Sequence, residues 1–136
     1  MILRSATPDD VEGILALWRR AEAEPSATDD RTSLLLLLET DTSALLVAED
    51  DGHLVGTVMV TFDGWRANLY RLAVAPGRRR HGVARALVEE GERRARNRGA
   101  RRFSATVLVA ETRAVAFWEA AGYRPDSRVT RFTKTL

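Results

Sequence analysis

Residues 74–91, VAPGRRRHGVARALVEEG, place three arginines and two glycines directly before a helical pattern. The first amides of a helix have no backbone partner, and the helix dipole adds a partial positive charge at the same end. Together these groups suit a phosphate. Gly82 and Ala84 leave the backbone uncovered, while Arg79 and Arg80 add side-chain charge at the rim. The stretch therefore predicts a phosphate-binding turn, with a plain basic helix start as the alternative.

Other residues that could carry chemistry are few. The chain has no cysteine, which excludes thiolate metal ligands and cysteine nucleophiles. Its two histidines, His53 and His81, have no acidic residues at the spacing of metal ligands, so we expect no metal site. Neither the dinucleotide-binding string G-x-G-x-x-G nor the P-loop string G-x-x-x-x-G-K-S/T occurs. The turn therefore belongs to neither of these nucleotide-binding classes.

Charge is unevenly distributed along the chain. There are 21 basic and 19 acidic residues, a net charge of +2, but residues 78–102 hold ten arginines against three glutamates. Such a segment favours an anionic partner, either nucleic acid or a small phosphorylated ligand. No zinc-finger spacing, helix-turn-helix signature or aromatic-interleaved basic strand supports nucleic acid. We therefore expect no nucleic-acid partner, and we interpret the later arginines as a solvated helix face.

Length and hydrophobic runs indicate a single soluble domain. The 136 residues suit one domain, 1–136. No apolar run approaches the roughly 20 residues that a membrane-spanning helix needs. The first residues, MILRSATPDD, are too short and too polar for a signal peptide. We expect a cytoplasmic protein with no membrane partner.

The spacing of apolar residues predicts the elements that position the turn. Thr7 and Pro8 indicate a helix start, and Asp51-Gly52 between two apolar runs indicates a β-hairpin. The predicted strands cover residues 2–6, 43–50, 53–62, 67–76, 102–109 and 128–136. The predicted helices cover residues 8–21, 31–40, 81–98 and 112–121. Gly99 and Gly122 close the last two helices. This order predicts a mixed sheet with helices on its faces.

Two motifs resemble those of the GNAT superfamily of N-acetyltransferases. RRHGVA (79–84) matches the family signature Gln/Arg-x-x-Gly-x-Gly/Ala, and LYRLAVAP (69–76) looks like the strand that precedes it. RAVAFWEAAGY (113–123) is similar to the second motif, Ala-x-x-Phe/Leu-Tyr-x-x-x-Gly-Phe/Tyr. The resemblance spans almost the whole chain in order and suits the small single-domain bacterial members. It implies an α+β fold with a mixed, mostly antiparallel sheet of six to seven strands, splayed at strands 4 and 5 and flanked by about four helices.

The resemblance also implies acetyl-CoA as acetyl donor, wedged between the fourth and fifth strands. The backbone of Leu72 and Val74 would pair with the pantetheine arm. Amides around the turn would hold the pyrophosphate, at Arg79, Arg80, Gly82, Val83 and Ala84. The thioester end would be lined by Ala114, Phe117 and Trp118, of which the two aromatic residues are also expected to pack in the core.

The chain departs from the family pattern where protons are handled. Trp118 replaces the usual tyrosine, and Glu111 replaces the usual asparagine at the start of that helix. An indole N–H donates hydrogen bonds but is not a useful acid. The candidate catalytic residues are therefore Tyr70, Glu111 and Tyr123, for which a packed tyrosine or a surface carboxylate is the ordinary interpretation.

Three functions follow as hypotheses. The first is an acetyl-CoA-dependent N-acetyltransferase that moves an acetyl group directly to a primary amine of a small molecule, peptide or protein. The second is an acyl-CoA-binding protein of the same fold with weak or no catalysis, because Trp118 and Glu111 replace the usual residues. The third is a nucleic-acid binder that uses the arginines. The acceptor stays open, as does the choice between monomer and homodimer.

Overall fold

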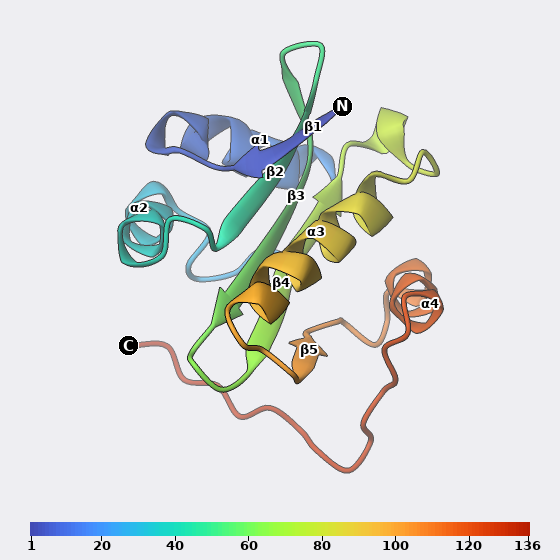
Figure 1. Ribbon diagram of the computed structural model, residues 1–136. Helices are drawn as coiled ribbons and strands as arrows, with labels where there is room; N and C mark the ends of the chain where they lie inside the picture. Colours follow the sequence, from blue (N-terminus) through green and yellow to red (C-terminus); the bar gives the residue numbers. More distant parts are fainter.

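A five-stranded mixed sheet forms the centre of the computed structural model, which describes residues 1–136 (Figure 1). The strands lie in chain order: β1 (Ile2–Ser5), β2 (Leu45–Asp50), β3 (His53–Phe62), β4 (Ala67–Val74) and β5 (Phe103–Ala105). The first three pairings are antiparallel, whereas β4 and β5 are parallel. The predicted α+β class with a mixed, mostly antiparallel sheet is therefore confirmed.

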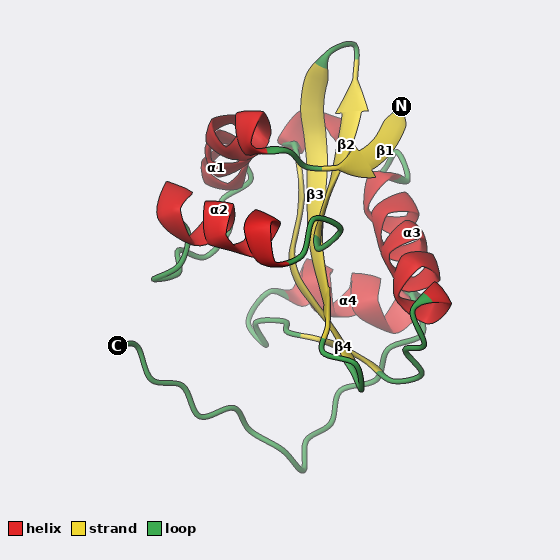
Figure 2. Cartoon of the chain, turned by 60° about the vertical axis from the view of Figure 1, so that its left-hand side comes forward, coloured by secondary structure: helices red, strands yellow, loops and turns green.

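Helices cover both faces of the sheet, as Figure 2 shows. The helical elements are η1 (Pro8–Asp10), α1 (Val11–Arg20), α2 (Arg31–Thr40), η2 (Pro76–Arg78), α3 (Val83–Asn97) and α4 (Thr112–Ala120). Helices α1 and α2 lie on one face, and α3 and α4 lie on the other. None of them combines the length and hydrophobicity that crossing a membrane requires.

Local sequence signals fix the helix ends close to where they were predicted. The Asp30 carboxylate accepts a 2.7 Å hydrogen bond from the Ser33 amide and so caps α2. Gly99 and Gly122 follow α3 and α4 with φ values of +111° and +96°, a conformation that glycine adopts without strain. The Leu-rich run 31–40, ambiguous by periodicity, is a helix as predicted, and it buries Leu34 and Leu38.

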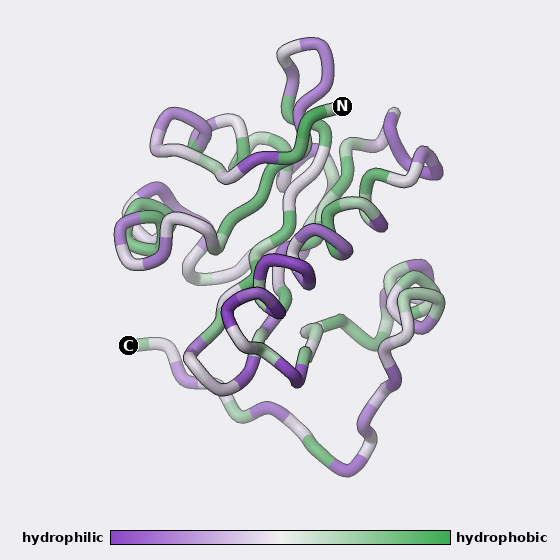
Figure 3. Tube along the Cα trace, in the orientation of Figure 1, coloured by the Kyte–Doolittle hydropathy of each residue, from purple (hydrophilic) through white to green (hydrophobic).

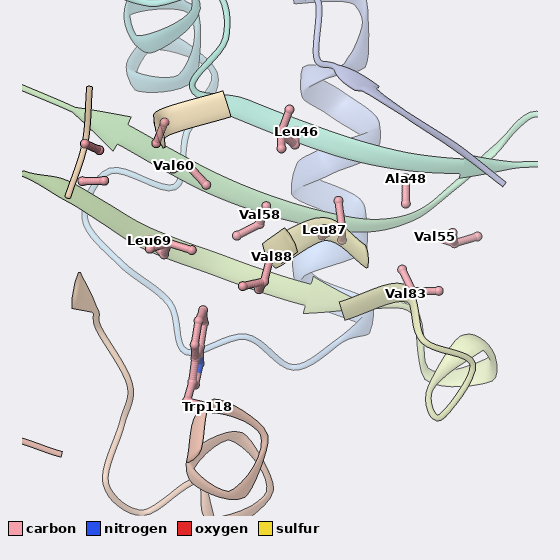
Figure 4. Packing of buried hydrophobic residues seen from close by; sticks show 13 residues of the cluster. Leu46, Ala48, Val55, Val58, Val60, Leu69, Val83, Leu87, Val88 and Trp118 are labelled. Carbon is pink, nitrogen blue, oxygen red and sulfur yellow. The ribbon is translucent and has the colours of Figure 1, made fainter. Parts of the chain in front are cut away.

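Two hydrophobic clusters lie on opposite faces of the sheet. The larger one joins the sheet to α3 and α4, and Figure 4 shows Leu69, Leu87, Val88 and Trp118 meeting there. The smaller one packs α1 and α2 against the other face. In Figure 3 the hydrophobic colouring follows the strands, and the hydrophilic colouring follows the outer side of α3. The apolar side chains therefore hold α3 by one face only.

Helix α3 approaches the sheet closely at two glycines. A Cβ on Gly56 of β3 would lie 2.8 Å from Val83 Cγ1 and 2.9 Å from Leu87 Cδ1. A Cβ on Gly91 of α3 would lie 2.5 Å from Val60 Cγ2. All three distances are too short for a real Cβ contact, so a larger residue at either position would force the helix or the facing side chains to shift. This close approach matters because the first turn of α3 carries the predicted phosphate site.

The sheet has five strands rather than the six to seven expected. The predicted strand 102–109 is paired only over Phe103–Ala105, and the predicted strand 128–136 forms no strand in the chain. β-branched residues favour an extended backbone, but a strand forms only where a neighbouring backbone accepts its hydrogen bonds. Residues 128–136 have no such neighbour here. The expected splay is present, because β5 leaves β4 after three paired residues.

We expect Gly56→Ala to lower the free energy of unfolding by about 1–3 kcal/mol, because the added methyl overpacks the contact between β3 and α3. Gly77→Ala is the matched control, since nothing lies within 4 Å of its Cβ position. Thermal and urea denaturation of the two variants measure the difference. Equal stabilities would show that α3 moves away from the sheet without cost.

Candidate functional site

The edge of β4 becomes free beyond Leu69. Strands β4 and β5 pair only where Ala67–Leu69 face Phe103–Ala105. Their last hydrogen bond runs from the Thr106 amide to the Leu69 carbonyl, at 3.2 Å. From Tyr70 to Val74, β4 keeps β3 as its only neighbouring strand. One side of this stretch therefore presents unpaired backbone groups.

The backbone of Val74 faces this free edge. The Ala75 amide donates to the Val55 carbonyl of β3 at 2.9 Å. Backbone groups of successive residues in a strand point to opposite sides, so those of Val74 point away from β3. Val74 is one of the two residues predicted to pair with an extended ligand. The other, Leu72, lies two residues earlier, where the strand register shifts.

A β-bulge in β4 lies next to that edge. Thr57 pairs with Ala73, and Met59 pairs with Tyr70. One residue of β3 lies between these two pairs, against two residues of β4. The extra residue lies at Arg71 and Leu72, and Arg71 has a φ of +52°. That conformation is uncommon outside glycine and needs support from its surroundings.

A buried hydrogen-bond chain supports the bulge. The indole Nε1 of Trp18 donates to Thr57 Oγ1 at 2.9 Å, and that hydroxyl donates to the Arg71 carbonyl at 2.9 Å. Thr57 is fully buried and Trp18 is nearly so. This hydrogen-bond chain gives a partner to both the indole N–H and the threonine hydroxyl, and it fixes the direction of the Arg71 carbonyl.

The side chain of Arg71 ties the bulge to the segment between α1 and α2. Its guanidinium donates to the Glu24 carbonyl at 2.8 Å and forms an ion pair with Asp29 at 2.5 Å. It also lies 5.2 Å from the centre of the Trp18 ring. Both charged side chains are mostly buried, with exposed fractions of 17% and 20%. The loop after α1 is thus anchored to the strand that carries the free edge.

The predicted phosphate turn has a backbone that suits an anion. Arg80 and Gly82 have φ values of +66° and +80°, and α3 begins at Val83. None of the seven consecutive amides from Arg79 to Arg85 donates a hydrogen bond within the chain. A Cβ on Gly82 would meet nothing within 4 Å, so glycine is needed there for its conformation, and the space around it is open. Such consecutive free amides at a helix start form an anion-binding concavity.

The three arginines of the turn have different surroundings. The Arg78 guanidinium pairs with Asp50, which lowers the pKa of that carboxyl. The Arg79 guanidinium donates to the Ala21 carbonyl at the end of α1, at 3.2 Å. Arg80 is exposed and has no partner within the chain. Among the three, only the Arg80 guanidinium is free to reach a ligand at the turn.

The aromatic side chains of the second motif pack rather than project. Trp118 is buried, and Figure 4 shows its ring pointing from α4 toward Leu69 and Val88. Phe117 touches it edge-on at 5.4 Å between ring centroids, and Tyr123 does so at 4.9 Å. The Trp118 Nε1 makes no hydrogen bond within the chain, yet it is not fully buried. Ala114 is half-buried in the first turn of the same helix.

The three proton-transfer candidates do not lie together. Tyr70 stands opposite Met59, whose side chain packs under α1 and α2, so it projects from the face opposite Trp118. Its hydroxyl makes no hydrogen bond within the chain. Glu111 is exposed at the start of α4 and makes no capping bond.

Tyr123 is held differently from Tyr70. Its hydroxyl donates to Glu92 Oε2 on α3 at 2.6 Å. Burial raises the pKa of the Tyr123 phenol well above its usual value, and the neighbouring Glu92 carboxylate raises it further. The phenol therefore stays protonated and directs its proton to Glu92.

The hydrogen bonds that join Trp18, Thr57 and Arg71, and the one between Tyr123 and Glu92, are not predicted by the sequence. Trp18 lies in the predicted helix 8–21, and Thr57 lies in the predicted strand 53–62. No spacing rule links residues 18, 57 and 71, because the fold alone brings them together. A threonine in an otherwise apolar stretch of β3 is the one signal that could have drawn attention.

We expect Thr57→Val to lower the free energy of unfolding by about 1–3 kcal/mol, because it leaves the buried Trp18 indole N–H without an acceptor. It also frees the Arg71 carbonyl, so any ligand that pairs with the β4 edge should bind less tightly. Thr57→Ser keeps the hydroxyl and is the matched control. Denaturation curves of both variants test this expectation, and a valine variant as stable as wild type would contradict it.

This chain is similar to known proteins in both sequence and fold. A sequence model of the acetyltransferase (GNAT) family matches residues 11–123. An acetyltransferase of Pectobacterium atrosepticum is 30% identical over 130 residues, which cover 96% of this chain and 92% of that protein. Ard1 of Thermoplasma volcanium has a TM-score of 0.83 at 20% identity, over 93% of this chain and 84% of that one. The PaiA N-acetyltransferase of Thermoplasma acidophilum, solved in complex with coenzyme A, has a TM-score of 0.80 at 17% identity, over 92% and 90%. Both structures share the fold described above.

Proposed function

Because this chain belongs to the acetyltransferase (GNAT) family, we propose that it is an N-acetyltransferase that uses acetyl-CoA as donor. The acceptor is a primary amine of a small molecule, peptide or protein. One observation supports acetyl-CoA as the donor. Seven consecutive unpaired amides, from Arg79 to Arg85, lie at the start of α3 and close in sequence to the free edge of β4. A pyrophosphate and a pantetheine amide chain need these two kinds of backbone surface.

The turn fits the phosphates of the donor. Amides of Arg79, Arg80, Gly82, Val83 and Ala84 would hold the pyrophosphate, with the dipole of α3 behind them. The Arg80 guanidinium would add a charge-assisted contact, since it has no partner within the chain. Arg79 would contribute through its backbone amide, because its side chain caps α1.

The remaining contacts would come from β4 and α4. The backbone groups of Leu72 and Val74 would pair with a pantetheine arm that adds to the free edge of β4 like a strand. Ala114, Phe117 and the indole edge of Trp118 would line the thioester end. Packing of Trp118 in the core gives this wall a fixed position.

When bound, acetyl-CoA supplies an acetyl group activated as a thioester. The chain orients the acceptor amine beside it, which is its largest contribution to the rate. A backbone amide near Val74 would polarise the carbonyl oxygen of the bound thioester. No covalent attachment to the protein is needed for direct transfer.

Proton handling falls to Tyr70, Glu111 and Tyr123. Tyr123 donates its hydroxyl proton in a hydrogen bond to Glu92, so it is a poorer proton donor than Tyr70. Tyr70 has a free hydroxyl on the strand that carries the reaction, so we assign it the contact with the acceptor. Glu111 is exposed and takes the amine proton directly or through water. A thiol with a pKa near the cysteine reference of about 8.5 can leave as an anion with little help.

A specific observation favours a second candidate. The residue in the place of the usual tyrosine, Trp118, is buried in the core and cannot act as an acid. A protein that binds acyl-CoA and catalyses weakly or not at all would tolerate this substitution. Thiol release measured on a panel of primary amines separates the candidates. Turnover with any amine supports the enzyme, and binding without turnover supports the second candidate.

For the donor site, we expect acetyl-CoA to raise the melting temperature, because a ligand that binds only the native state stabilises it. Arg80→Ala should weaken acetyl-CoA binding by about tenfold, equivalent to about 1.4 kcal/mol. Arg93→Ala is the matched control, since Arg93 lies further along α3 and pairs with Glu90. Calorimetric titration measures both.

The donor prediction fails if acetyl-CoA leaves the melting temperature of the wild type unchanged. Equal losses of affinity at Arg80 and Arg93 would indicate diffuse electrostatic attraction. That result would favour the nucleic-acid-binding hypothesis.

For the missing acid, we expect Trp118→Phe to keep measurable activity and Trp118→Tyr to leave it similar or raise it. Tyr70→Phe and Tyr123→Phe should each lower kcat by far less than the upper end of the range of about 10²–10⁴-fold for general acid–base catalysis. Profiles of kcat against pH on the amine found in the panel measure these effects. A collapse in one tyrosine variant with acetyl-CoA binding intact would show that its phenol does the acid work.

A further inference from the structure

Two arginines of the proposed donor site reach the segment that connects α1 to α2, residues 21–30. The Arg71 guanidinium, from the bulge of β4, donates to the Glu24 carbonyl at 2.8 Å and pairs with the Asp29 carboxylate at 2.5 Å. The Arg79 guanidinium, from the phosphate turn, donates to the Ala21 carbonyl at 3.2 Å. No other hydrogen bond joins this segment to the sheet or to the turn. One short segment therefore contacts both parts of the proposed donor site.

The segment holds the groups that accept these two arginines in fixed positions. The Ser26 amide donates to Asp29 Oδ2 at 3.0 Å, and the Asp29 amide donates to the Ser26 carbonyl at 3.1 Å. The Ala21 carbonyl lies at the C-terminal end of α1, where the helix dipole places a partial negative charge. A guanidinium is favoured beside a carboxylate and beside such a carbonyl. Arg71 and Arg79 therefore bind to groups that the segment itself has already placed.

Arg71 needs this support because of its backbone. Its φ of +52° is a conformation that a residue other than glycine keeps only when its surroundings hold it. The Thr57 hydroxyl fixes the Arg71 carbonyl, and the ion pair with Asp29 fixes the Arg71 side chain. Because both charged side chains are mostly buried, dissolved salt screens their attraction only weakly. Residues 72–74 follow directly and belong to the free edge of β4. A change at Asp29 therefore reaches that edge through a single residue.

We propose that Asp29 is a positioning residue for acetyl-CoA, although it lies on neither surface that the donor would touch. Through Arg71 it holds the free edge of β4 in the geometry that pairs with the pantetheine arm. The start of the same segment holds the phosphate turn through Arg79. This inference rests on the proposed donor site, and it adds that residues 21–30 set the position of the edge relative to the turn.

The covalent structure of the donor makes this relative position matter. Its pantetheine arm and its pyrophosphate are joined, so the donor contacts both surfaces fully only when their spacing fits. A surface that must first be ordered binds more weakly, because part of the interaction free energy is used for the ordering. A coupling free energy between two sites acts in both directions. Bound coenzyme A should therefore make residues 21–30 harder to open.

Calorimetric titration with coenzyme A tests the role of Asp29. Asp29→Asn keeps the size of the side chain and removes its charge, and we expect it to weaken binding by about tenfold. Glu12→Gln is the matched control. It removes an ion pair of 3.2 Å with Arg31, which joins α1 to α2 but contacts neither β4 nor the turn. This control should bind coenzyme A as the wild type does.

A fragment of the ligand separates positioning of the edge from general damage to the fold. The nucleotide part of coenzyme A, 3′-phosphoadenosine 5′-diphosphate, has the phosphates but no arm that could pair with β4. Asp29→Asn should bind this nucleotide as tightly as the wild type does, because the effect of Asp29 passes through Arg71 to the edge alone. Equal losses of affinity for the nucleotide and for coenzyme A would overturn the positioning role.

A double-mutant cycle tests whether Asp29 acts through Arg71. We expect Arg71→Gln to weaken the binding of coenzyme A at least as much as Asp29→Asn does. The double variant should lose no more affinity than Arg71→Gln alone, because either substitution already breaks the same contact. Additive losses would show that the two residues act separately, and would overturn the inference.

The outcomes for the wild type separate this inference from the proposed function. A wild type that does not bind coenzyme A overturns both. A wild type that binds it, with unchanged affinity in Asp29→Asn, overturns this inference alone. Hydrogen exchange without any ligand gives an independent readout: the amides of residues 72–74 should exchange faster in Asp29→Asn than in Glu12→Gln. Identical exchange in these two variants would mean that the edge keeps its geometry without the ion pair, which also overturns the inference.

Discussion

The early separation of β4 from β5 is the constraint on which the candidate site depends. Three paired residues hold the strands together, and the remainder of β4 presents a backbone edge with no neighbour. Unpaired backbone in a sheet is normally a liability. Here the same chain supplies both a free strand edge and, directly after it, seven free amides at the start of α3. An extended ligand with a phosphate end matches that pair of surfaces.

Buried hydrogen bonds fix the backbone next to the free edge of β4. The Thr57 hydroxyl accepts a hydrogen bond from the Trp18 indole N–H and donates one to the Arg71 carbonyl, so buried hydrogen bonds fix the bulge. The Arg71 side chain then anchors the loop after α1 through Asp29. Buried polar chains of this kind are costly when one member is lost, because a desolvated donor or acceptor remains. Strand β4 and the loop after α1 are therefore joined through these contacts.

The position of α3 is decided by packing rather than by charge. Gly56 and Gly91 let the helix lie close against β3, where a larger residue would force the helix or the facing side chains to shift. Its arginines play unequal parts: Arg93 and Arg94 pair with Glu90, and Arg98 pairs with Asp41. Five of the ten arginines of residues 78–102 thus pair with carboxylates, and in the turn before α3 the Arg80 guanidinium has no partner within the chain. The interpretation of the later arginines as a solvated face agrees with these pairs.

The sequence by itself determined the helices, the hairpins, the family and the turn before α3, because each is written in neighbouring residues or in a motif of fixed spacing. The roles of Leu72, Val74, Tyr70 and Glu111 stay predictions. Only the tertiary structure decided that β5 is short, that residues 128–136 form no strand within the chain, and that Tyr123 bonds to Glu92. The pairing of β4 with β5, the Tyr123–Glu92 hydrogen bond and the Arg71–Asp29 ion pair join residues 31 to 42 positions apart. No local pattern encodes such distances, since chain folding alone brings these atoms together.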